Sequence, residues 1–149
     1  MMTIHWLLLA VLLFLAGQGH ALTPASLSPA GNPVTTVRLG ETRLQVELVS
    51  TPEKLYLGLG GRRHLPWGTG MLFILPTREI QTFCMRGMLI PIDIIWIDQD
   101  RVIGCHENLQ PQDPGSFSSP GPVNLVLEVP AGFAAAAGLR PGTKLVWEK

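Results

Sequence analysis

The chain has 149 residues, 15% of them charged, and its 11 basic and 11 acidic side chains give a formal net charge of zero. This length suits one domain with a modest core, and the small charged fraction excludes a disordered polyelectrolyte. A neutral chain also lacks the basic surface that nucleic acids require, so we predict no nucleic-acid partner.

Residues 1–21 have the pattern of a secretory signal peptide. They contain no Lys, Arg, Asp or Glu. The apolar run at 6–16 is shorter than the roughly 20 residues that span a bilayer. Gly19 and Ala21 are small residues at the two positions that a signal peptidase reads. We expect cleavage after Ala21, an exported periplasmic or secreted product, and no membrane span in the mature chain. An uncleaved membrane anchor is the alternative.

Residues 22–33 are rich in Pro, Ser, Ala and Gly and are predicted to form a flexible leader. Residues 34–149 then form a single globular domain. Its first two segments alternate apolar and polar residues, with Gly40 and Glu41 between them, which predicts a hairpin of two half-buried strands.

A short helix is predicted to begin after Thr51. Thr51 suits the N-cap, Pro52 the first helical position and Glu53 the positive end of the helix dipole. Glycines at 58, 60 and 61 limit this helix to about two turns. A second short helix is expected at 131–137, ended by Gly138 in the left-handed conformation.

Short apolar segments indicate further strands, and Pro76 is expected to end the first of them. These segments lie at 71–75, 81–86, 92–98, 101–107, 122–129 and 144–147. The expected fold is α+β and mainly β: a compact, barrel-like rolled sheet of about eight short strands with two short helices.

Three runs of sequence resemble the domain of unknown function 192 family. They are residues 82–98 (TFCMRGMLIPIDIIWID), 58–75 (GLGGRRHLPWGTGMLFIL) and 125–142 (LVLEVPAGFAAAAGLRPG). The resemblance covers about residues 35–147. It implies a small, β-rich, often exported domain and carries no established activity. Cys84 departs from the family pattern, which usually has an aromatic residue there.

Arg86 and Asp93 are polar residues inside an apolar stretch and are the first candidates for a site. In a strand at 92–98, Asp93 shares a face with Ile95 and Ile97, so its carboxylate must find donors. It could accept backbone N–H groups of the turn at 87–91, or pair with Arg86 and fasten a hairpin. The functional alternative is a ligand-binding or proton-transferring carboxylate at the barrel mouth, with Arg86 as an anion clamp.

His106 and Glu107, beside a long loop at 108–122, complete the set of ligand-binding candidates with Arg86 and Asp93. The histidines lack metal-ligand spacing, so we predict no metal and no cofactor. Glu128 is interpreted as exposed or paired.

Cys84 and Cys105 are the only two cysteines of the chain. An exported protein can keep a disulfide between them. The alternative is a pair of buried free thiols.

These features favour a binding or accessory module for a small ligand or glycan. One alternative is a hydrolase in which Asp93 converges with Glu107 or Glu128. Another is a structural protein-interaction domain with an exposed apolar patch at Trp67 and Phe117. The sequence leaves open whether the chain is an enzyme, which ligand it takes and its oligomeric state.

Overall fold

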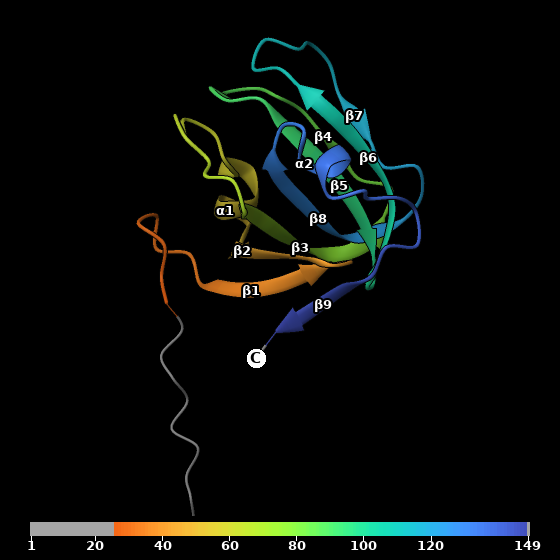
Figure 1. The fold of residues 1–149 in the computed structure, drawn as a ribbon. Helices are drawn as coiled ribbons and strands as arrows, with labels where there is room; N and C mark the ends of the chain where they lie inside the picture. The colour runs from red at the N-terminus through yellow and green to blue at the C-terminus, as the bar shows by residue number, and fades with distance from the viewer. Residues whose placement is uncertain (1–25, 149) are drawn as a thin grey trace, which may run out of the picture.

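The computed structural model describes residues 26–148, which form a seven-stranded sheet curled into a half-barrel (Figure 1). The mainly β, barrel-like fold is confirmed. The predicted signal peptide at residues 1–21 lies outside the described residues. The strands are β1 Val34–Leu39, β2 Thr42–Val49, β3 Thr69–Glu79, β4 Thr82–Phe83, β5 Ile92–Asp98, β6 Arg101–Leu109, β7 Phe117–Ser118, β8 Val123–Pro130 and β9 Leu145–Glu148, and the helices are α1 Pro52–Leu57 and α2 Phe133–Ala136.

The sheet has the strand order β6-β5-β8-β3-β2-β1-β9, and β4 pairs separately with β7. Neighbouring strands are antiparallel except β2 and β3, which are parallel and are connected through α1. The two edge strands approach each other at one end, where Arg101 pairs with Lys144. There the Val102 N–H donates to the Thr143 carbonyl at 2.9 Å. This contact closes one end of the half-barrel.

Two apolar clusters lie on opposite faces of the sheet. The inner cluster draws side chains from all seven strands and includes Phe133 of α2. The outer cluster is centred on β3, β5 and β8 and is covered by residues next to α1, β4 and β7. Along β5 the residues alternate as predicted, with Ile94 and Trp96 in the outer cluster and Ile95 and Ile97 in the inner one. The central strands are therefore buried on both faces.

The local signals near the amino end of the domain are confirmed. Leu39 of β1 pairs with Thr42 of β2 across the predicted turn. The Thr51 side chain accepts the Lys54 N–H at the start of α1. The expectation that Pro76 ends a strand is wrong, because β3 continues to Glu79. The pairing of β3 with β8 is irregular between Ile74 and Glu79, so the missing N–H of Pro76 interrupts no regular ladder.

The expected hairpin of 81–86 with 92–98 does not form. Thr82 and Phe83 pair with β7, whereas β5 pairs with β6 and β8. The residues between them form a turn in which Met88 donates its N–H to the Met85 carbonyl and Gly87 has a φ of 76°. Met85 and Met88 are both buried in the outer cluster. Residues three apart in a strand point to opposite faces, so Met85 and Met88 can enter the same cluster only because the chain turns between them.

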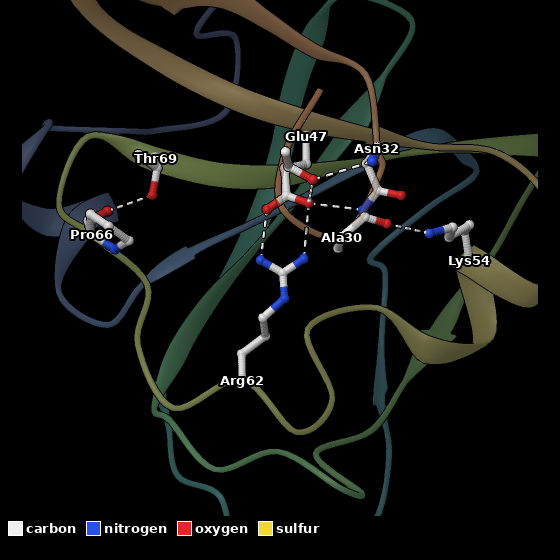
Figure 2. Close-up of polar contacts among 8 residues, drawn as sticks. Ala30, Asn32, Glu47, Lys54, Arg62, Pro66 and Thr69 are labelled. Atoms are coloured by element: carbon white, nitrogen blue, oxygen red, sulfur yellow. Dashed lines mark hydrogen bonds and ion pairs between the residues drawn. The ribbon is translucent and has the colours of Figure 1, made fainter. Parts of the chain in front are cut away.

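Residues 26–33, the described part of the predicted leader at 22–33, form a turn that is hydrogen-bonded to the domain. Ser28 and Asn32 both donate to Oε2 of Glu47 on β2, each at 2.8 Å. Arg62 binds the same carboxylate through two nitrogens at 2.6 and 2.9 Å, as Figure 2 shows. Arg62, as the largest contribution, lowers the pKa of Glu47 to about 2. The composition of residues 22–33 does not reveal these contacts, because the anchoring groups come from β2 and the loop after α1.

Candidate ligand-binding pocket

Asp93 is fully buried, and both of its carboxylate oxygens accept hydrogen bonds from the backbone. Its Oδ1 accepts the N–H groups of Asn108 at 2.8 Å and Gly132 at 3.1 Å, and its Oδ2 accepts that of Ala134 at 2.8 Å. The carboxylate thus joins β6 and the start of α2 to β5. The donors are not those of the turn at 87–91, and Arg86 is not among them. Because both carboxylate oxygens accept backbone N–H groups, we assign Asp93 a structural role.

Arg86 is exposed and lies near α1, away from the Asp93 interactions. Its guanidinium stands over the Tyr56 ring, with 5.9 Å between the guanidinium carbon and the ring centroid. This separation allows a cation–π contact. No carboxylate of residues 26–148 forms an ion pair with Arg86. Its side chain instead borders a pocket on the outer face of the sheet.

This pocket has a volume of about 640 Å³ and lies among α1, β4 and the turn after β4. Phe73 of β3 and Phe83 of β4 contribute aromatic walls, with their ring centroids 5.1 Å apart in an edge-on arrangement. Arg86, Cys84 and Glu128 are among its few polar residues. The full lining consists of Leu55, Tyr56, Leu57, Gly58, Leu59, Gly60, Gly61, Phe73, Thr82, Phe83, Cys84, Arg86, Gly87, Met88 and Glu128.

Glu128 enters the pocket because of the register of the central strand β8. It pairs with Ile94 of β5 on one side and with Met71 of β3 on the other. Both neighbours belong to the outer cluster, so Glu128 points to the outer face, while Leu127 and Val129 point to the inner one. Expecting Glu128 to be exposed or paired was wrong: its exposed fraction is 5%.

The carboxyl of Glu128 has an unsatisfied oxygen. Its Oε2 is buried and forms no hydrogen bond with any residue of 26–148. Burial raises the pKa of Glu128 to about 8, so the carboxyl is mainly protonated at neutral pH. Gly58 lies beside it, since a Cβ on Gly58 would be 4.0 Å from Oε2 and 3.2 Å from the Phe73 ring. With a φ of 50° and no side chain, Gly58 leaves this corner of the pocket open.

The structure does not bring the four predicted site residues together. His106 is half-buried, and its Nδ1 accepts the Trp96 Nε1–H at 2.9 Å. Its ring packs between Trp96 and Phe117. Glu107 is exposed on β6. Of Arg86, Asp93, His106 and Glu107, only Arg86 lines the pocket that contains Glu128.

The two cysteines are free thiols and lie in different parts of the molecule. Cys84 is exposed and lines the outer pocket. Cys105 is half-buried against the inner cluster, where burial raises the pKa of its thiol and Glu107 and Asp93 add to the shift. The alternative of a Cys84–Cys105 disulfide is not realised in the structure.

The geometry also bears on the other two functional alternatives. Asp93 pairs in register with Val129, so Asp93 and Glu128 extend to opposite faces and do not converge for acid–base work. Trp67 is exposed and packs on Phe133, whereas Phe117 is half-buried beside the outer cluster. These two aromatic residues do not form a common apolar patch.

Within residues 26–148, no helix is long and apolar enough to cross a membrane. The same part of the chain has no group of three or more His, Cys, Asp or Glu side chains placed to hold a metal ion.

The described residues form a small, mainly β half-barrel domain in which Glu128 is buried beneath a pocket on the outer face. The chain belongs to the domain of unknown function 192 family, described as uncharacterized ACR, and matches it over residues 34–147. The family resemblance noted from the three sequence runs is thereby confirmed. No curated protein matches the chain.

Two solved structures are similar to this chain over most of its length. One is a protein of unknown function from Novosphingobium aromaticivorans DSM 12444, with 32% identity and a TM-score of 0.78, covering 85% of this chain and 94% of that one. The other, from Sinorhizobium meliloti 1021, is described as a proposed transcription regulator. It has 30% identity and a TM-score of 0.74, covering 78% of this chain and 95% of that one.

The sequence analysis considered Glu128 only as a second acid beside Asp93 in the hydrolase alternative and did not predict its burial in a pocket, although a signal was available. The run PVNLVLEV at 122–129 is nearly continuous in apolar residues. Such a run is typical of a strand buried on both faces, where any charged residue must also be buried.

Proposed function

We propose that this domain is a binding or accessory module that holds a small molecule in the outer pocket. The observation that carries the proposal is the buried Oε2 of Glu128, which lacks a partner at the base of a cavity. An unpartnered buried polar group is destabilising, and natural proteins keep such groups mainly where function needs them. A ligand that forms a hydrogen bond or ion pair with Glu128 would remove this penalty.

The lining favours a small molecule over a glycan. Most of the pocket residues are apolar, and the polar groups are few, which is typical of small-molecule sites. A hydrolase is less well supported, because Glu128 has no second acid beside it in the pocket lining.

We also propose that the domain acts after export, as the pattern of residues 1–21 predicts. Expression of the full chain in a bacterial host should give a periplasmic product whose intact mass corresponds to a start at Leu22. An Ala21→Phe variant, which blocks the cleavage position, should keep the longer mass. An unprocessed wild-type chain in the membrane fraction would contradict export with cleavage.

A fragment screen tests binding in the pocket. Amines, carboxylates, amides and neutral sugars are added at millimolar concentration to the isotope-labelled protein, and amide shifts are mapped by NMR. We expect hits that shift residues 82–88 and Gly58 and that weaken in Glu128→Gln. The matched control Glu107→Gln removes an exposed carboxylate outside the pocket and should change nothing. If no compound of any class binds at the pocket, the proposed function is wrong.

A further inference from the structure

We propose that the ligand is zwitterionic, of the amino-acid or short-peptide class, with its ammonium group on Glu128 and its carboxylate on Arg86. This inference rests on the proposed function, because it names the ligand of the same pocket. Arg86 and Glu128 are the only Lys, Arg, Asp or Glu side chains among the residues that line it. Arg86 is positively charged and Glu128 is negatively charged once its carboxyl ionises, and neither forms an ion pair with another residue of 26–148.

Three features at the inner end of the pocket favour a cation. The unpartnered Oε2 of Glu128 is an acceptor once the carboxyl ionises, and an ammonium group beside it favours that ionised form. Residues 55–58, which include the carboxyl-terminal end of α1, line the same space, and a helix end of this polarity attracts positive charge. The lining also includes the Phe73 and Phe83 rings, and aromatic rings attract an ammonium group.

The outer end favours an anion. Arg86 is exposed at the rim, and its guanidinium is held over the Tyr56 ring without a carboxylate partner in the described part of the chain. A guanidinium presents two parallel N–H donors that match a carboxylate. The lining also includes Leu55, Leu59 and Met88, whose apolar side chains suit the hydrocarbon part of the ligand.

Matched probes separate the two ends of the ligand. Calorimetric titrations compare γ-aminobutyrate, δ-aminovalerate and ε-aminocaproate, which differ only in the span between ammonium and carboxylate, with hexylamine and with caproate. We expect one of the zwitterions to bind at least about tenfold more tightly than either single-ended compound. Protection of the Cys84 thiol from alkylation, with Cys105 as the internal reference, confirms that the probe occupies the pocket.

Single substitutions test which residue binds the ammonium group of the ligand and which binds its carboxylate. Glu128→Gln should weaken every amine-containing probe and leave caproate unchanged. Arg86→Met should abolish the preference for the best zwitterion over hexylamine while amine binding remains. Arg63→Met, which removes an exposed arginine outside the pocket, is the matched control and should leave all affinities unchanged.

The pH profile is an independent readout. An ammonium group binds the ionised carboxyl, so the dissociation constant should fall by about tenfold per pH unit as the pH rises toward 8. The other titratable groups that line the pocket are Tyr56, Cys84 and Arg86, and the strand neighbours Met71 and Ile94 carry no charge. Glu128→Gln should abolish this slope.

Two outcomes would overturn the zwitterion assignment and leave the proposed function standing. One is that neutral or purely anionic compounds bind at the pocket more tightly than the zwitterions. The other is that affinity for the protein falls as the pH rises through about 8, as it would for a ligand that accepts a hydrogen bond from the neutral carboxyl. If none of the probes nor any fragment protects Cys84 or shifts the pocket residues, both proposals fail together.

Discussion

Asp93→Asn should lower the free energy of unfolding by about 2–4 kcal/mol, because hydrogen bonds to a buried charged acceptor contribute roughly 1.5–3 kcal/mol each. The two carboxylate oxygens hold three backbone N–H groups. Asparagine keeps one acceptor and places an NH₂ group where the other oxygen was. At least one N–H at Asn108 or at the start of α2 then loses its partner inside the protein.

The measurement is urea unfolding, with the thermal midpoint as a second probe, on the purified domain at neutral pH. A loss of this size should lower the midpoint by roughly 10 °C in a domain of this length. Arg86→Met is the comparison variant, because it alters the other polar residue of the same apolar stretch. Its effect should stay within about 0.5 kcal/mol, as for surface substitutions without buried partners. Equal losses in the two variants would contradict the separation of Asp93 from Arg86.

The comparison of these two residues shows how far the sequence could predict the site. Strand alternation correctly put Asp93 on the face of Ile95 and Ile97, because that period is local. The donors at positions 132 and 134 could not be predicted, since they are about 40 residues away and reach Asp93 only when α2 folds over β5. Arg86 and Asp93 are close in sequence, but the turn between them separates their side chains.

The pocket, like the donors of Asp93, depends on contacts between distant parts of the chain that the sequence could not predict. Most strands, the capping of α1 and the end of α2 followed from local signals, whereas the predicted strand at 81–86 is reduced to Thr82–Phe83 and β3 continues past Pro76. Whether Glu128 is exposed depends on which strands flank β8 and on what covers the outer face. Those contacts come from β3, β5 and α1, so they depend on topology and not on local periodicity.

Glu128 should make the domain less stable as the pH rises, in contrast to the usual behaviour of a carboxyl group. Its folded-state pKa of about 8 lies above its ordinary value of 4.5. Between these two pH values the folded chain holds a proton that the unfolded chain has released. The contribution of this proton to stability is therefore fully present below pH 4.5 and is lost as the pH rises toward 8, on the order of 1.4 kcal/mol for each pH unit.

Glu47 should act in the opposite direction at acid pH. Its pKa is lowered to about 2 from 4.5, so its contribution is present above pH 4.5 and is lost as the pH falls toward 2. The wild-type domain should accordingly be most stable near pH 4.5, where neither loss has begun in full. Without the proton bound at Glu128, this profile would be nearly flat from pH 4.5 up to the alkaline range in which the Cys105 thiol ionises.

Glu128→Gln tests whether Glu128 causes the loss of stability above pH 4.5, because glutamine has nearly the same shape and carries no charge at any pH. Urea unfolding of this variant from about pH 4.5 to 9 should show no loss, so that it exceeds the wild type in stability by the largest margin above pH 8. Glu107→Gln should keep the wild-type slope, since that carboxyl is exposed. Parallel slopes in wild type and Glu128→Gln would mean that water or a rearranged side chain solvates Oε2, so that no ligand is needed to satisfy this oxygen.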